Sequence, residues 1–211
     1  MRTMEWPRLV GMLLIAAMLG GCAFGRTYSY SDVPVGLQGV ASAGTVAVGV
    51  QDARPYVLSG GKTDHFVGLM RGGFGNPFDV NTQSGGPLAV EIRDAIVRAL
   101  KARSIAAEPV TIPSSDTVGA AKRRLEQAKA RRLVLVTLRE WKSDSMVNTD
   151  LHYDAMLIVF DEGGSQLATS SVKGMDNLGS LGLSPNEGIA RAAARKIDAL
   201  FDDEKVIAAL R

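Results

Sequence analysis

The sequence predicts an α/β protein whose folded part is a single-domain sandwich, with helices packed on a mixed, partly antiparallel sheet. Two observations predict this class. A strand pattern, an amphipathic helix pattern and a second strand pattern follow one another between residues 45 and 112, which is the order of a parallel crossover. Three more strand patterns lie between residues 133 and 173, and a glycine-bearing turn joins the last two as antiparallel neighbours.

The first half of the domain supplies the crossover. Thr45–Val50 alternates β-branched with small residues, as expected of a strand with a buried face. Residues 53–86 hold eight glycines and little periodicity, so we expect a long irregular loop that is functional or mobile. A helix is expected from Pro87, at the first helical position, where a missing N–H costs nothing. Its apolar stripe consists of Leu88, Ile92, Ile96, Ala99 and Leu100.

The second half supplies the antiparallel strands. Ala107–Ile112 reads as the second strand of the crossover, and Ser115 or Asp116 is expected to cap a helix after it. The inward residues of that helix are Val118, Ala121, Leu125 and Ala128. The three later strands are Leu133–Trp141, Asp150–Phe160 and Gln166–Lys173, with a turn at residues 161–165. Ser184 and Glu187 form a capping box for a last helix. Its buried face consists of Ile189, Ala193, Ile197 and Leu200.

The first 21 residues have the order of a secretory signal peptide: a charged start, an apolar run and small residues. Arg2 and Arg8 precede the apolar run, which extends from Leu9 to Leu19. This run is too short to cross a membrane, since a spanning helix needs roughly 20 apolar residues for about 30 Å of hydrocarbon. We therefore expect residues 1–21 to be removed from the mature protein.

The end of this segment, in which Leu19, Gly20 and Gly21 precede Cys22, resembles the lipobox of bacterial lipoproteins. The resemblance implies that the Cys22 thiol receives a diacylglyceryl group, that the signal is cut before this residue, and that the new amine is acylated. Cys22 is the one cysteine of the chain, so the alternative is an ordinary signal peptide with an incidental cysteine. Two or more acyl chains hold a protein stably on a membrane, whereas one chain is marginal.

Residues 22–43 are expected to be the lipidated N-terminus and a flexible tether, because Ser, Gly, Tyr and Pro occur there without clear periodicity. Ala23 stands where, in this class, an aspartate resembles a signal for inner-membrane retention. The expected location is therefore the periplasmic face of the outer membrane. The domain is expected over residues 44–211, a length that buries about 70% of its unfolded surface.

The charge balance gives no reason to expect a nucleic-acid partner. The chain has 24 Lys and Arg residues and 22 Asp and Glu residues. Removal of the signal peptide takes away two basic side chains and one acidic side chain, so the mature chain is nearly neutral. The main basic run contains Lys122, Arg123 and Arg124, which we expect on the wet side of a helix. Its alternative role, at a membrane, is contact with lipid phosphates or an acidic partner.

Several local patterns resemble the YajG-like family of uncharacterised outer-membrane lipoproteins. They are the lipobox, the strand ending in Asp52-Ala53-Arg54, the helix LAVEIRDAIVRALKAR from Leu88, the run from Leu133 to Lys173, and a terminal helix ending near Val206-Ile207. The loop at 53–86 is longer than the family suggests. The resemblance implies the fold and an envelope location, and it carries over no catalytic residue.

Catalytic and metal-binding patterns are weak. Ser165 and Ser184 lack the closing glycine of a nucleophile elbow and read as a turn residue and a helix cap. Gly61-Lys62-Thr63 lacks the first glycine of a phosphate-binding loop. His65 and His152 are too few and too isolated for a zinc site. We therefore expect no metal and no cofactor apart from the lipid on Cys22.

Four acidic residues leave one enzymatic alternative open. Asp150 and Asp154 share a face of one strand, and Asp161 and Glu162 lie in the following turn. Paired carboxylates hydrolyse glycans, so an envelope hydrolase is the alternative function. Solvation of a polar face explains the same residues without chemistry.

The segment HFVGLMRGGFGNPFDV holds too many large apolar groups for a solvated loop: Phe66, Leu69, Met70, Phe74 and Phe78. They are expected either to form a lid over the domain's own core or to contact another envelope protein or an acyl chain. Since no nucleophile, metal set or phosphate loop is evident, we expect no enzymatic activity. The predicted function is a lipid-anchored, non-catalytic binding or assembly component at the outer membrane.

Overall fold

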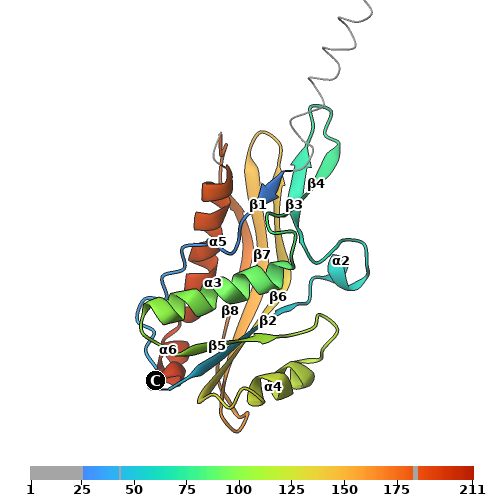
Figure 1. Cartoon of the computed structure of the whole chain (residues 1–211). Coiled ribbons are helices and arrows are strands. Elements are labelled where there is room, and N and C mark those ends of the chain that lie inside the picture. Colours follow the sequence, from blue (N-terminus) through green and yellow to red (C-terminus); the bar gives the residue numbers. More distant parts are fainter. Residues whose placement is uncertain (1–25, 43, 183–184) are drawn as a thin grey trace, which may run out of the picture.

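The structure is a computed structural model that describes residues 26–42, 44–182 and 185–211. Cys22, the Leu19–Gly21 motif and Ser184 lie outside the described residues. These residues form one mixed sheet of eight strands with helices packed against it, as predicted (Figure 1). The strands are β1 Thr27–Tyr28, β2 Val46–Asp52, β3 Phe66–Arg71, β4 Pro77–Thr82, β5 Ala107–Thr111, β6 Arg132–Ser145, β7 Thr149–Asp161 and β8 Gln166–Asn177. The helices are α2 Pro55–Leu58, α3 Leu88–Ala102, α4 Val118–Glu126, α5 Pro185–Phe201 and α6 Glu204–Leu210.

The central strand is β6. Along one edge it pairs antiparallel with β7, which pairs with β8 through the predicted turn. Its other edge pairs in parallel with β2 along residues 132–138 and with β3 along residues 143–145. The sheet then continues from β3 to β4 and β1, and from β2 to β5. The long antiparallel β6–β7–β8 unit therefore supports two shorter groups of strands, placed one after the other along β6.

The predicted parallel crossover is confirmed. Strands β2 and β5 are parallel neighbours, with Val46 opposite Ala107, and the connection between them contains α2, the β3–β4 hairpin and then α3. Successive side chains of β2 point to opposite faces of the sheet and enter two different cores. Val46, Val48 and Val50 face the main core, which includes α3, α5 and α6, whereas Ala47 faces a smaller core under α4. Helices α3 and α4 therefore lie on opposite faces of the sheet (Figure 1).

The helices largely follow the predicted apolar stripes. The five stripe residues of α3 and the four of α5 are all buried. Helix α4 begins after Thr117, whose side chain accepts from the Ala120 N–H, and not after Ser115 or Asp116. Val118 is exposed, although it was expected to face inward. The terminal helix is two helices, because the Asp203 carboxylate caps a new one by accepting from the Lys205 and Val206 N–H groups.

The expectation of a long irregular loop at 53–86 was wrong. This segment contains α2 and the antiparallel hairpin of β3 and β4. Gly68, which weakened the strand pattern, is needed where β3 meets β6, since a Cβ there would lie 2.1 Å from the Ser143 Oγ and 2.7 Å from its carbonyl oxygen. Glycine in a strand often marks such a close approach of two backbones, and local sequence alone does not distinguish it from a loop glycine.

The expectation of a flexible tether was also wrong over residues 26–42. This segment adds β1 in parallel to β4 and then crosses the main core. Its buried side chains are Tyr28, Tyr30, Val33, Leu37 and Val40, each 2% exposed or less. Carboxylates of the domain hold its backbone: Glu91 accepts from the Tyr30 and Ser31 N–H groups, and Asp198 from those of Gly36 and Leu37. The segment is irregular, so its buried residues have no period that local pattern analysis detects.

Candidate functional site

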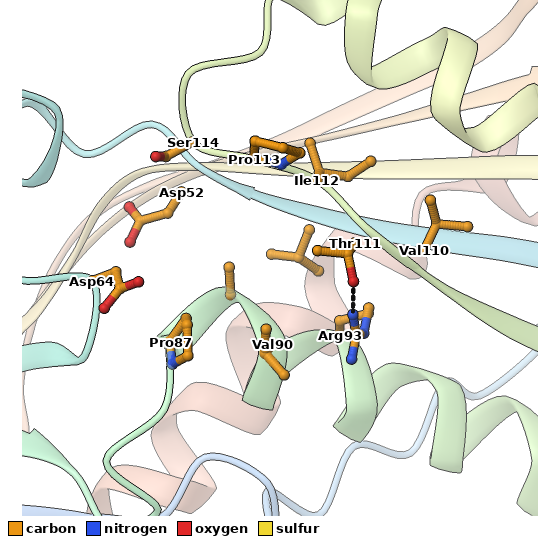
Figure 2. A pocket seen from close by; sticks show the side chains of 12 residues that line it. Asp52, Asp64, Pro87, Val90, Arg93, Val110, Thr111, Ile112, Pro113 and Ser114 are labelled. Atoms are coloured by element: carbon orange, nitrogen blue, oxygen red, sulfur yellow. Dashed lines mark hydrogen bonds between the residues drawn. The ribbon is translucent and has the colours of Figure 1, made fainter.

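A cavity of about 260 Å³ opens at the carboxyl ends of β2 and β5, beside the first turn of α3 (Figure 2). Its walls come from three segments that are distant in the sequence: the end of β2, the residues from Pro87 to Arg93, and the residues from Val110 to Ser114. Asp64, just before β3, completes the rim.

The topology of the sheet creates this hollow. After β2 the chain forms α2 and the β3–β4 hairpin and then begins α3, which packs on the main-core face. After the neighbouring strand β5 it continues to α4 on the opposite face, so the cavity lies between connections that run to opposite faces of the sheet. Such switch points are the usual ligand-binding positions of open α/β sheets. The cavity is therefore the best candidate for a binding site among the described residues.

The lining combines an apolar wall with a few polar groups, as is typical of binding sites. Val50, Val90, Val110 and Ile112 form much of the wall. Figure 2 shows Asp52 and Asp64 together at one side of the cavity and Arg93 at the other.

The polar groups differ in how far they are already engaged. The Arg93 guanidinium donates from Nη1 to the Thr111 hydroxyl over 3.0 Å and from Nε to Asp94 over 2.8 Å. The Asp64 side chain is 52% exposed, and its carboxylate lies 3.4 Å from the His65 Nδ1. The cavity thus presents an accessible carboxylate at one side and a guanidinium that is held in place at the other.

A buried ion pair fixes the wall next to Asp64. The Arg54 side chain is fully buried, and its Nε and Nη2 donate to the two carboxylate oxygens of Asp52 over 2.8 and 2.6 Å. The remaining donors reach the backbone carbonyls of Phe66, Trp141 and Asp64. Burial alone would lower the pKa of Arg54, but the hydrogen bonds and charge of Asp52 outweigh it and raise the pKa. Arg54 therefore ties the end of β2 to the start of β3 and the middle of β6.

The four acidic residues considered for glycan hydrolysis do not converge on the cavity. Asp150 accepts from the Asn177 side chain, Asp154 pairs with Lys173, the Asp161 carboxylate accepts from the Ser165 N–H of the turn, and Glu162 is exposed. Asp150 and Asp154 are four residues apart on an extended strand, about 13 Å along the chain at 3.3 Å per residue. Glycosidase carboxylates are roughly 5–9.5 Å apart, so these two do not form such a pair.

Glu140 is the acidic residue opposite Asp154 in the β6–β7 register, and the sequence patterns did not single it out. It accepts a 2.7 Å hydrogen bond from the Tyr56 hydroxyl and another from the Trp141 N–H. Burial raises the pKa of Tyr56, and this hydroxyl therefore stays a proton donor to Glu140. Since Glu140 is engaged in this way, its main effect is to fasten α2 to the sheet.

The predicted basic run lies on α4, away from the cavity. Arg124 pairs with Asp116 at 2.5 Å, and Lys122 lies 3.4 Å from Glu126 and donates to the Gly164 carbonyl. Arg123 is exposed. Local partners thus engage two of the three cations.

The five apolar residues of the predicted contact segment do not share one surface. Phe66 is buried and packs edge-to-face against Tyr56, and Met70 packs against the main core. Leu69 and Phe78 are half-buried. Phe74, at the tip of the β3–β4 hairpin, is 98% exposed. Phe66 and Met70 therefore pack within the domain, and a contact role stays a prediction for Phe74.

The cavity residues were missed at the level of sequence. The signal for them was indirect: a strand–helix–strand order with Gly86-Pro87 at the helix start predicts a crossover, and a second helix on the opposite face makes a switch point. Local patterns do not show on which face a helix packs. Asp52 and Arg54 were noted only as a strand end, although two opposite charges after an apolar strand were a usable sign of a buried pair.

These features define an α/β protein with a switch-point cavity. Among its described residues, no helix is long and apolar enough to cross a membrane. No family model and no curated protein matches the sequence. Several solved structures, among them the three that follow, are similar at low identity.

Protein XCC0632 from Xanthomonas campestris, of family DUF330, is 15% identical, with 89% of this chain and 92% of that chain covered and a TM-score of 0.45. The PelC dodecamer from Paraburkholderia phytofirmans is 14% identical, with 81% and 89% covered and a TM-score of 0.42. Lipoprotein GNA1162 from Neisseria meningitidis is 11% identical, with 72% and 96% covered and a TM-score of 0.31. At these values the similarities carry no argument about family, activity or assembly.

Proposed function

We propose that the protein is a bacterial lipoprotein, anchored through acylated Cys22 at the periplasmic face of the outer membrane, which binds a partner protein and catalyses no reaction. The signal peptide, the lipobox at Leu19–Cys22 and Ala23 support the anchor and its location. The switch-point cavity is the single observation that carries the binding role.

The groups around the cavity favour binding over chemistry. Ser114, on its rim, is exposed, and the described residues that line the cavity include no histidine or cysteine. Asp52 is engaged by Arg54, and Arg93 by Asp94 and Thr111. Among the described residues no three or more His, Cys, Asp or Glu side chains cluster to hold a metal. The envelope hydrolase has less support, because its acidic residues are engaged elsewhere.

The size and charge of the cavity indicate what it binds. Its volume of about 260 Å³ is below the roughly 300–1,000 Å³ of typical small-molecule sites. A hollow of this size suits one or two inserted side chains. The valine and isoleucine wall suits an aliphatic stem, and the exposed Asp64 carboxylate suits a positive end, so a lysine or arginine of a partner protein fits best.

Site-specific photo-crosslinking tests the binding role. A photoreactive phenylalanine analogue replaces Val90, on the cavity wall, in the full-length protein in living cells. The matched control carries it at Val118, which is exposed on α4 outside the cavity. We expect a discrete crosslinked protein from position 90 only, and we expect Asp64→Lys to abolish it by charge repulsion. The same crosslinks from positions 90 and 118 would contradict a cavity-specific partner.

Replacement of Cys22 tests the anchor. We expect Cys22→Ser to leave the membrane pellet or to accumulate uncleaved, because no thiol remains to receive the diacylglyceryl group. Membrane fractionation with intact-mass measurement reports both the location and the lipid. An unmodified Cys22 in the wild-type protein, or normal fractionation of Cys22→Ser, would rule out the anchor.

A further inference from the structure

Three loops lie at the same end of the molecule: the β3–β4 tip (residues 72–76), the β6–β7 turn (146–148) and residues 178–182 before α5 (Figure 1). A second cavity, of about 120 Å³, joins the last two of these loops to Arg26, the first described residue. We call these three loops, together with Arg26, the apical end. The β7–β8 turn lies at the opposite end of the sheet (Figure 1).

The apical end is apolar at its tips and uncharged in its loops. The side chains of Phe74, Val147 and Met146 are 98%, 79% and 57% exposed. The loops read GGFGN, MVN and LGSLG and contain no Asp, Glu, Lys or Arg. The nearest ion pair of β3 and β6, Arg71 with Asp144 at 2.6 Å, lies behind the tips, and its hydrogen bond lowers the pKa of Asp144. Arg71 and Asp144 therefore both stay charged, and their opposite charges compensate each other next to the loops.

The hairpin tip holds Phe74 in its exposed position. The Gly72 N–H donates to the Asn76 carbonyl, and the Gly75 N–H donates to the Gly72 carbonyl. Gly75 has a φ of +81°, which glycine adopts without strain. The exposed ring is therefore presented by a closed turn that is hydrogen-bonded to itself.

The chain enters the domain at this same end. The Arg26 carbonyl accepts from the Asn81 N–H of β4, and the Arg26 side chain lines the second cavity. Cys22 precedes Arg26 by four residues, and an extended chain spans at most about 3.6 Å per residue, so their Cα atoms are within about 14 Å. An acyl group on Cys22 therefore keeps the apical end at the membrane surface.

We propose that the apical end is a membrane-contact surface, in which Phe74, Met146 and Val147 enter the interfacial layer of the bilayer that holds the Cys22 lipid. This inference rests on the proposed anchor. Separate apolar tips, uncharged loops and a short connection to the anchor suit a deformable lipid interface, where apolar side chains bury next to the headgroups. Arg26, which lines the second cavity together with Met146 and Val147, supplies a cation for lipid phosphate. The domain then stands with β6 and β7 directed away from the membrane, and the switch-point cavity lies to the side of the sheet, free for a partner.

Fluorescence of the acylated full-length protein in phospholipid vesicles tests this orientation. The chain has two tryptophans, Trp6 in the signal peptide and the fully buried Trp141. Phe74→Trp and Val147→Trp each place a reporter at the apical end. The matched control is Leu167→Trp, on β8 next to the β7–β8 turn and 44% exposed in the wild type. In vesicles of phosphatidylethanolamine and phosphatidylglycerol with brominated lipid, we expect the apical reporters to shift to shorter wavelength and lose most of their emission. The control is expected to keep its emission.

Vesicle flotation separates the two levels of the proposal. Variants that float with the vesicles, with no quenching at positions 74 and 147, would overturn the membrane contact while the anchor stands. Equal quenching at positions 74 and 167 would also overturn it, since the domain would then have no preferred end at the bilayer. Failure of all variants to float would overturn the anchor, and the membrane contact with it. Protection of position 74 from a water-soluble quencher in native envelopes but not in vesicles would instead assign this end to a protein partner.

Discussion

A chain that begins at residue 44 is expected not to fold, whereas a chain that begins at Arg26 is expected to fold cooperatively. The shorter chain lacks five fully buried side chains of the N-terminal segment, from Tyr28 to Val40. Each contributes about 1.5–3 kcal/mol by burial, so the loss is roughly 8–15 kcal/mol as an upper estimate. This equals the whole stability of a typical domain, about 5–15 kcal/mol. Circular dichroism and urea unfolding of the two chains, both without the lipid, measure the difference.

The chain from Arg26 serves as the control, because it lacks the signal peptide and Cys22 as well. A point variant separates lost packing from lost hydrogen bonds. Glu91→Ala keeps every buried apolar group but leaves the Tyr30 and Ser31 N–H groups without their acceptor. It is expected to cost about 1–3 kcal/mol. A cooperative, native-like unfolding transition from the chain that begins at residue 44 would show that the N-terminal segment is dispensable and that the domain begins where the sequence pattern suggested.

Arg54→Met is expected to lower the free energy of unfolding by about 3–5 kcal/mol. The variant keeps the length of the side chain but removes the guanidinium, so the buried Asp52 carboxylate loses its charged partner and keeps only the N–H of residue 54 as a donor, and the Phe66 carbonyl loses its Arg54 donor. The cost of an unpaired buried charge exceeds the gain of burying a thioether. Urea unfolding at neutral pH measures the change.

Two further variants make the Arg54 result specific. Arg71→Met removes the same kind of side chain from the more accessible pair with Asp144 and is expected to have little effect on stability. The double variant Arg54→Met with Asp52→Asn removes the unpaired charge and is expected to recover part of the loss. A loss in Arg54→Met no larger than that in Arg71→Met would contradict the role of Arg54 in joining β2, β3 and β6.

The two proposals place different functions at different parts of one sheet. The apical end lies near the carboxyl end of β6, which pairs with β3 and, through β3, supports β4. The switch-point cavity lies near the first part of β6, which pairs with β2 and, through β2, supports β5. A protein with this arrangement faces the membrane with its hairpin tips and presents a side-chain-sized hollow laterally. The hydrogen bonds of Arg54 lie between the part of β6 that pairs with β2 and the part that pairs with β3. One side chain therefore contacts β2, β3 and β6.

Local patterns were sufficient to predict the fold class, the parallel crossover, the three strands β6, β7 and β8 with antiparallel pairing of the last two, and the buried stripes of α3 and α5. Each of these depends on a period along the chain, 2 for strands and 3.6 for helices, which a short segment shows without its neighbours. The lipobox prediction depends on a local pattern too, and it concerns residues outside those that the structure describes.

Only tertiary contacts decided the position of the N-terminal segment, the β3–β4 hairpin, the Arg54 ion pair and the switch-point cavity. Residues 26–42 have no regular period, and their buried residues are recognised only against α3, α5 and the sheet. Gly68 looks like a loop residue until Ser143 of β6 lies against it. The cavity lies between α3, which leads into β5 on one face of the sheet, and the connection from β5 to α4 on the other face. That arrangement depends on the packing of the whole sheet and not on any single segment.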